Sequence, residues 1–207
     1  MQNIKIRDAI AIILVTGIIV IISYFFFDRD IALFFDEVVT KDMTIFLDIL
    51  TTLGRGDLYI VLSLIIFLIY RKKDMFYKKL SLSILWSVIA SGVLVNILKV
   101  FFARHRPLAL FDDNLYGLTW FDGGYIVASF PSGHTTTVFS VFILLILIFQ
   151  RYKVWFLVVA MITASTRVVL AAHYLSDVIA GGLLGSFVAY FIYKKYYLKD
   201  DEVKNDS

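Results

Sequence analysis

Six long apolar stretches alternate with polar or mixed segments along the sequence. The apolar stretches cover residues 9–27, 58–70, 80–98, 135–149, 154–170 and 178–193. A helix needs about 20 mostly apolar residues to cross the hydrocarbon core of a membrane. The second stretch is shorter than this unless its helix begins within residues 54–57. The pattern predicts an all-α bundle of six membrane-spanning helices.

The segments outside these stretches complete the expected organisation. The first stretch ends in FFFDRD, without the small residues of a cleavage site, so it predicts a retained helix rather than a signal peptide. Residues 31–53 mix apolar and charged side chains, which is typical of amphipathic helices on the outer membrane surface and equally of a structured loop. We expect one membrane domain over residues 1–198 and a polar cytoplasmic tail over residues 199–207.

The amino-acid composition supports a membrane protein and excludes several kinds of site. Hydrophobic residues make up 60% of the chain and the mean hydropathy is +0.83, whereas soluble domains are about 45–50% apolar. The chain contains no cysteine, which excludes disulfides, thiolate metal sites and cysteine nucleophiles. The net charge of +3 is too small to indicate nucleic-acid binding.

The positions of the cations predict the orientation in the membrane. Six helices place both termini on one side, and that side holds 13 of the 20 lysine and arginine residues. Cytoplasmic loops carry such an excess, so we expect cytoplasmic termini in a cell membrane. Three cations occupy the outer loops, namely Arg29, Lys41 and Arg55. The other four cluster near the outer ends of the helices: Lys99, Arg104, Arg106 and Arg167.

Three polar clusters gather on the same outer side. They are KVFFARHRP at 99–107, ASFPSGHTTTVFS at 128–140 and TRVVLAAHYLSD at 166–177. A lysine or arginine at membrane depth costs about 2.5–3.5 kcal/mol on insertion scales, so a bound anion is the simplest counter-charge for several together. The planar fork of arginine matches phosphate oxygens, whereas lysine acts as a point charge. The helix of the fourth stretch, expected to begin at residues 129–132, adds free backbone N–H groups.

Two histidines and an aspartate in these clusters indicate the chemistry. His173 and Asp177 are four residues apart, so on one helix they share a face. The carboxylate can hold one imidazole nitrogen and leave the other free to attack phosphorus. His134 could protonate the leaving oxygen. With the nearby cations as an anion cradle, this set favours phosphoryl transfer through a phosphohistidine.

The order and spacing of the motifs resemble the type-2 phosphatidic acid phosphatase family of membrane lipid phosphatases. The matching residues are Lys99, six intervening residues and Arg106-Pro107; then Pro131-Ser132-Gly133-His134; then Arg167, five intervening residues, His173, three intervening residues and Asp177. The resemblance implies that His173 is the nucleophile, Asp177 its partner and His134 the general acid. It also implies a phosphate site made of Lys99, Arg106, Ser132, Gly133 and Arg167.

Two positions depart from the family pattern. The third motif opens with Thr166 where family members usually have serine, and Ala171 stands where many have glycine. Both changes concern the shape of the pocket rather than the nucleophile. Two histidines and an aspartate can also bind zinc, but the neighbouring cations would repel the ion. We therefore expect neither a metal nor a cofactor.

The remaining residues near the clusters have plainer interpretations. We interpret His105 as a loop or interfacial residue and Arg104 as an anchor of the helix end, with a contact to a head-group phosphate as the alternative. The hydroxyls interpreted as helix-cap and early-turn residues are Ser129, Thr135, Thr136 and Thr137. The aromatic residues interpreted as a membrane-interface belt are Trp120, Phe121 and Tyr125. The glycines expected to allow close helix packing are Gly181, Gly182 and Gly185.

The resemblance implies hydrolysis of a lipid phosphate or diphosphate of the bilayer, whose head group enters at the membrane–water boundary. A compact domain with an outward-facing site suits undecaprenyl diphosphate, which we favour as the substrate. The alternatives are phosphatidylglycerophosphate, phosphatidic acid, lipid A, or phosphoryl transfer to another lipid. Two other classes stay open, a transporter and a non-catalytic lipid-phosphate binder, although a transporter would distribute its charges through the spans. We expect no nucleic-acid partner and no obligate protein partner.

Overall fold

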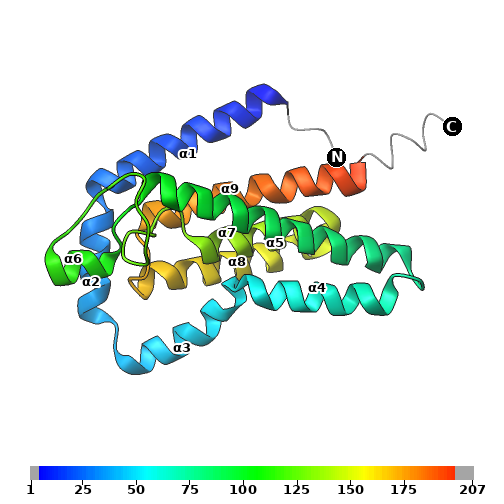
Figure 1. The fold of residues 1–207 in the computed structure, drawn as a ribbon, viewed down its shortest axis with the longest axis horizontal. Helices are drawn as coiled ribbons and strands as arrows, with labels where there is room; N and C mark the ends of the chain where they lie inside the picture. Colours follow the sequence, from blue (N-terminus) through cyan, green and yellow to red (C-terminus); the bar gives the residue numbers. More distant parts are fainter. Residues whose placement is uncertain (1–4, 199–207) are drawn as a thin grey trace.

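The computed structural model describes residues 5–198, which form a helical bundle (Figure 1). The α-helices are α1 (Ile6–Phe26), α2 (Asp28–Val38), α3 (Lys41–Thr51), α4 (Gly56–Tyr70), α5 (Met75–Phe102), α6 (Pro107–Asp113), α7 (Gly133–Ile148), α8 (Lys153–Val169) and α9 (Leu175–Tyr193). Three short helical turns accompany them: η1 (Thr52–Gly54), η2 (Gln150–Tyr152) and η3 (Lys194–Leu198). The described part of the chain is therefore all-α, as predicted.

Several of these helices are suited to cross a membrane. Four spans are long and apolar enough to do so: α1, α5, α8 together with η2, and α9 together with η3. Helix α4 and the preceding α3–η1 segment are bent by 47° and qualify together as a fifth span. Helix α7 is apolar but has only 16 residues. The protein is a polytopic membrane protein, and the expected count of six spans requires α7 as the sixth.

The helices lie where the apolar stretches predicted them, with some longer ends. Helix α5 begins five residues before the stretch at 80–98, because the Asp74 carboxylate accepts hydrogen bonds from the N–H groups of Phe76 and Tyr77 and caps the helix. Helix α4 begins at Gly56, inside the range that the sequence left open. The mixed segment at 31–53 forms helices α2 and α3 rather than an irregular loop.

Helices α7 and α9 pack closely at the centre of the bundle (Figure 1). A Cβ atom at Gly181 would lie 2.8 Å from the carbonyl oxygen of Ser132, and one at Gly185 would overlap the carbonyl oxygen of Thr136. A Cβ at Gly182 would touch the ring of Phe139 at 3.4 Å. Small residues let helices approach closely within a membrane, so the interpretation of these glycines as packing positions is confirmed.

The three polar clusters meet at one end of the bundle. Figure 1 places the end of α5, the start of α7 and the loop between α8 and α9 at the same end, beside α2 and α6. The α4–α5 and α7–α8 connections lie at the opposite end. Segments far apart in the sequence are thereby brought together around the start of α7.

Candidate active site

Two of the predicted phosphate-binding cations converge on one backbone carbonyl. The Lys99 ammonium, in the last turn of α5, donates to the carbonyl oxygen of Ala128 at 2.9 Å. Arg106 donates to the same oxygen through Nη2 at 3.3 Å. Its Nε donates to Tyr125 O at 2.9 Å and its Nη1 to Ala172 O at 3.2 Å. Arg106 therefore holds the loop before α7 against the loop before α9.

Helix α7 begins later than the sequence suggested. It starts at Gly133 with Ser132 as the N-cap residue, rather than within residues 129–132. Pro131 explains the difference, because proline lacks a backbone N–H and disfavours a helical conformation at the preceding residue, Phe130. The first intrahelical bond runs from Thr136 N–H to Ser132 O. The free N–H groups of the first turn thus begin at Gly133.

The N–H groups before the helix are already occupied. Ser129 N–H donates to Arg104 O at 3.0 Å, and Ser132 N–H donates to Asp177 O at 3.1 Å. The Ser132 hydroxyl accepts a hydrogen bond from the Thr135 hydroxyl at 3.0 Å. These bonds fix the start of α7 against α9, so the serines hold the backbone in place while the Gly133 backbone remains half-exposed.

Arg167 presents an unused hydrogen-bond donor. Its Nη1 donates to the Thr51 hydroxyl at 2.9 Å, which ties α8 to the end of α3. Its Nε is buried and has no hydrogen-bond partner among residues 5–198. Its carbonyl oxygen accepts from the backbone N–H of His173 at 3.1 Å. Arg167, in the last turn of α8, is therefore joined through its backbone to the loop that carries His173, and an anion could satisfy its free donor.

The predicted partnership of His173 and Asp177 includes a third residue. Asp177 Oδ2 lies 3.7 Å from His173 Nδ1, and the Ser129 hydroxyl donates to the same Oδ2 at 2.6 Å. The Ser129 oxygen is also 3.5 Å from His173 Nδ1. The interpretation of Ser129 as a helix-cap residue is therefore wrong, because α7 begins four residues later. Asp177 Oδ2 further accepts the Tyr174 N–H at 2.9 Å.

The environment of His173 keeps its imidazole neutral. Only 3% of the residue is exposed. Burial lowers the pKa of His173 to about 3, although the Asp177 carboxylate opposes this and the charges of Arg106 and Lys99 reinforce it. This direction favours the neutral imidazole, in which one nitrogen carries a lone pair. With Nδ1 facing Asp177 and Ser129, that nitrogen can be Nε2.

Arg104 holds Asp177 from the other side. It is 1% exposed and donates to Asp177 Oδ1 at 2.5 Å, to Ser176 Oγ at 2.6 Å and to Asp28 Oδ2 at 2.7 Å. Burial lowers the pKa of Arg104, but the carboxylates of Asp177 and Asp28 raise it above its ordinary value. Both sequence interpretations of Arg104 are wrong, because an enclosed guanidinium neither anchors a helix end in the interface nor reaches a lipid head group.

Sequence reasoning also missed Asp28. This carboxylate, at the start of α2, is fully buried and accepts hydrogen bonds from Ser23 and Ser176 as well as from Arg104. The one sequence signal was its position in FFFDRD, directly after the first apolar stretch. An aspartate there is ordinarily exposed, and only the fold reveals its partners.

His134 lies at the start of α7 beside the turn that joins α3 to α4. A Cβ atom at Gly54 would lie 2.8 Å from His134 Cβ and 2.9 Å from its Cδ2, so this turn packs directly on the imidazole. The half-buried ring lies within electrostatic range of Lys99, Arg106 and Arg167. A cavity of about 340 Å³ opens beside it and also touches Lys99.

Four residues singled out in the sequence have local roles. The Thr166 hydroxyl donates to Thr163 O in its own helix, and Ala171 adopts a left-handed conformation with φ of 47°. Glycine adopts that conformation without strain, which explains why glycine suits this position. His105 lies in the loop after α5, where its backbone N–H donates to Gly117 O. The exposed Tyr125 ring stacks on Arg106, 4.1 Å from its guanidinium carbon.

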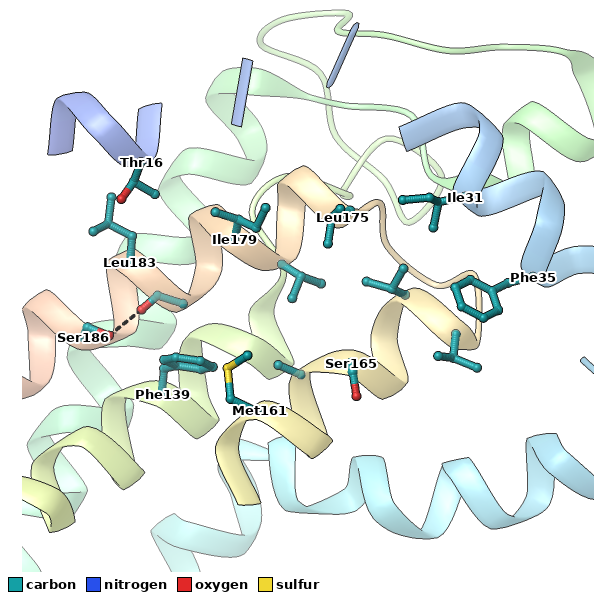
Figure 2. A pocket seen from close by; sticks show the side chains of 15 residues that line it. Thr16, Ile31, Phe35, Phe139, Met161, Ser165, Leu175, Ile179, Leu183 and Ser186 are labelled. Carbon is teal, nitrogen blue, oxygen red and sulfur yellow. Dashed lines mark hydrogen bonds between the residues drawn. The ribbon is translucent and has the colours of Figure 1, made fainter. Parts of the chain in front are cut away.

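A separate apolar cavity lies on another side of α9. It measures about 570 Å³ and is bounded by residues of α1, α2, α7, α8 and α9. Figure 2 shows mainly hydrocarbon side chains around this space, such as Ile31, Phe35 and Met161. None of the described residues that line it is titratable, so it offers no group for phosphoryl transfer. Within the described residues, no three histidine or acidic side chains are placed to hold a metal ion.

Two solved structures share this fold. A transmembrane PAP2-type phosphatidylglycerolphosphate phosphatase from Bacillus subtilis superposes with a TM-score of 0.62 at 19% identity, covering 94% of this chain and 98% of that one. LpxE from Aquifex aeolicus superposes with a TM-score of 0.61 at 24% identity, covering 84% and 98%. At such identities the likeness concerns the fold.

Curated relatives match over part of their length. Lipid A 1-phosphatase from Rhizobium etli is 44% identical over 101 residues, which are 49% of this chain and 44% of the relative. Lipid A 4'-phosphatase from Porphyromonas gingivalis is 33% identical over 137 residues, or 59% and 56% of the two chains. The chain spans about half the length of the curated relatives it matches. The sequence profile of the PAP2 superfamily matches residues 80–201. Because that range is more than half of the chain and contains all three polar clusters, the protein belongs to the PAP2 superfamily.

Proposed function

We propose that the protein is a metal-independent phosphatase that hydrolyses a membrane lipid phosphate through a phosphohistidine. The observation that carries this proposal is a buried His173 next to Asp177, in the loop that follows Arg167 and its unpartnered Nε at the end of α8. The neighbouring cations Lys99 and Arg106 provide further positive charge. Concentrated positive charge stabilises the charge that develops on phosphoryl oxygens during transfer. Membership of the PAP2 superfamily supports the same chemistry.

The proposed reaction has two steps. In the first, His173 Nε2 attacks phosphorus, the bond between phosphorus and the lipid oxygen breaks, and the protonated imidazole of His134 gives a proton to that oxygen and becomes neutral. In the second, His134 takes a proton from a water molecule, which attacks phosphorus and releases phosphate from His173. Asp177 orients the imidazole through Nδ1. The phosphate lies among Lys99, Arg106, Arg167 and the start of α7 at Ser132 and Gly133.

We propose a lipid A-type glycolipid phosphate as the leading candidate for the substrate. The matched relatives are named lipid A 1-phosphatase and lipid A 4'-phosphatase, and they support this alternative more than undecaprenyl diphosphate, the substrate favoured from the sequence. Undecaprenyl diphosphate, phosphatidylglycerophosphate and phosphatidic acid follow. Transfer of the phosphoryl group to another lipid would use the same first step, with a lipid hydroxyl in place of water.

The proposed location is a cell membrane, with one domain over residues 1–198 and six spans that include α7. The site then lies on the extracytoplasmic side and both termini are cytoplasmic, as the excess of lysine and arginine on the terminal side indicates. The expected tail at 199–207 lies outside the described residues. The bilayer and its lipid phosphates are the partners this function needs, and it needs neither a nucleic acid nor a further protein.

Phosphate release in the presence of excess EDTA tests the proposal. The detergent-purified protein is offered lipid A, undecaprenyl diphosphate, phosphatidylglycerophosphate and phosphatidic acid in parallel, with the His173→Ala variant as the blank. We expect release that persists in EDTA and is absent from the variant. Loss of release on metal removal, restored by added Mg²⁺ or Zn²⁺, would contradict the metal-independent mechanism. The absence of release from every lipid would contradict the hydrolase.

His134→Ala should affect poor leaving groups most. An alkyl alkoxide needs a proton to depart, whereas p-nitrophenolate departs without one, so loss of the general acid should slow the alkyl ester by about 10²–10⁴-fold and the p-nitrophenyl ester much less. The measurement compares kcat for p-nitrophenyl phosphate and a short-chain phosphatidic acid in wild type and variant. Equal losses for both substrates would contradict the general-acid role.

A further inference from the structure

The cavity beside His134 has a polar wall that the phosphoryl transfer does not use. On one side it is lined by Lys99, Gly133 and His134. On the other side, Arg55 and Asp57 project from the start of α4 and Asn96 projects from α5. None of these three residues belongs to the three polar clusters or to the bonds around His173.

The polar wall offers both donors and acceptors to a ligand. Arg55 and Asp57 form a two-point pair, with Nε to Oδ1 at 3.1 Å and Nη2 to Oδ2 at 2.5 Å. Their side chains are 59% and 61% exposed, and an exposed ion pair contributes little to stability. Asn96 donates through Nδ2 to Gly92 O at 2.8 Å, and no described residue donates to its carboxamide oxygen.

An apolar slot continues from this cavity. A second cavity of about 630 Å³ lies between α4 and α5 and shares Asp57 and Asn96 with the first. Its further lining is mainly aliphatic, with Ile60, Val88 and Val93 among the side chains. A ligand in both cavities would have a polar part beside His134 and an apolar part between the two helices, which is the shape of a lipid with a polar head group.

The proposed reaction determines which part of the substrate occupies this cavity. His134 protonates the leaving oxygen, so the group attached to that oxygen lies on the His134 side. We infer that Arg55, Asp57 and Asn96 form a head-group subsite that binds the sugar hydroxyls of a glycolipid phosphate. The inference rests on the proposed function and specifies its substrate class.

The chemistry of the three side chains favours a sugar over other leaving groups. A hydroxyl group both donates and accepts, so it can donate to the Asp57 carboxylate or the Asn96 oxygen and accept from Arg55. The phosphorylated leaving group of a prenyl diphosphate would bring its negative charge next to Asp57. The diacylglycerol released from phosphatidic acid carries no ring of hydroxyls to engage all three groups.

Substrate selectivity of three variants tests the subsite. We expect Asp57→Asn to lower the ratio of kcat/KM for lipid A over phosphatidic acid by about tenfold, the factor typical of a hydrogen bond to a charged group. Asn96→Ala should lower the same ratio by about fivefold, as for a neutral hydrogen bond. Asp42→Asn, an exposed acid on α3 outside both cavities, is the matched control and should leave the ratio as in wild type.

The outcomes separate this inference from the proposed function. Ratios equal to those of the Asp42→Asn control would overturn the subsite. So would a rise in undecaprenyl diphosphate hydrolysis by Asp57→Asn without a loss on lipid A, because the cavity would then receive a second phosphate. A wild type that hydrolyses phosphatidic acid but not lipid A would also overturn the subsite while leaving the phosphatase intact. A wild type inactive on every lipid would contradict the phosphatase itself.

Discussion

The His173→Ala variant should lose at least about 10³-fold of the wild-type turnover, because it removes the atom that forms the bond to phosphorus. The loss should be similar for every substrate, since all of them pass through the same phosphohistidine. In the wild type, the neutral imidazole is positioned by Asp177 and the Ser129 hydroxyl. The measurement is single-turnover phosphate release with saturating enzyme, together with protein-bound phosphate after an alkaline quench.

His105→Ala provides the matched control for this experiment. His105 is half-buried in the loop after α5, and its side chain makes no hydrogen bond with a described residue. We expect wild-type turnover and wild-type labelling from this variant, and neither from His173→Ala. If His173→Ala kept more than a few per cent of the turnover, or still became labelled, another residue would have to be the nucleophile.

Much of the fold could be predicted because the membrane imposes a length on each apolar segment. The stretch at 154–170 corresponds to α8 at Lys153–Val169, and that at 135–149 to α7 at Gly133–Ile148, each within two residues. The polar clusters were likewise visible, because charged residues stand out against apolar helices. Consecutive clusters are separated in the sequence by either no span or two spans. An even number of spans returns the chain to the same side, so all three clusters come to the same end of the bundle.

The parts that could not be predicted depend on contacts between distant segments. Asp28 and Arg104 are 76 residues apart in the sequence. An aspartate or an arginine alone does not show which distant residue it pairs with. A cation at a helix end is ordinarily explained by its side chain reaching the interface. That general tendency is overridden here, because two buried carboxylates surround the guanidinium. The same holds for Ser129, whose partner Asp177 lies 48 residues further along the chain.

Arg104 joins Asp177, near the start of α9, to Asp28 at the start of α2. Its guanidinium carbon also lies over the rings of Tyr24, Tyr116 and Tyr174, at distances of 4.7, 5.4 and 4.3 Å. Cations in such positions gain further stabilisation from aromatic rings, more so when they are removed from water. The guanidinium is thus enclosed by two anions and three rings. Asp177 Oδ1 accepts a hydrogen bond from Arg104, whereas Oδ2 accepts one from Ser129 and faces His173.

Replacing Arg104 with methionine should cost about 3–5 kcal/mol in the free energy of unfolding, because it leaves two buried carboxylates without their counter-charge. Asp177 would also lose the bond that holds Oδ1, so turnover should fall even in molecules that remain folded. The measurements are the denaturant midpoint in detergent and kcat of the folded fraction. Arg29→Met is the control, since Arg29 is exposed on α2. Its contacts are a hydrogen bond to Asn114 Oδ1 at 3.4 Å and the Tyr116 ring at 5.6 Å, so its loss should cost no more than about 1 kcal/mol.

A double-mutant cycle with Asp28→Asn separates the ion pair from the loss of packing. Arg104→Met leaves two buried carboxylates without a counter-charge, and Asp28→Asn leaves Arg104 with Asp177 as its one anion. The double variant removes one positive and one negative charge together and leaves Asp177 as the one buried carboxylate without Arg104. The losses should therefore not add, with a coupling of about 1–3 kcal/mol between the two positions. Turnover should remain low in the double variant, because Asp177 still lacks Arg104. Additive losses, or an Arg104→Met variant as stable as Arg29→Met, would contradict the buried network as a determinant of both stability and catalysis.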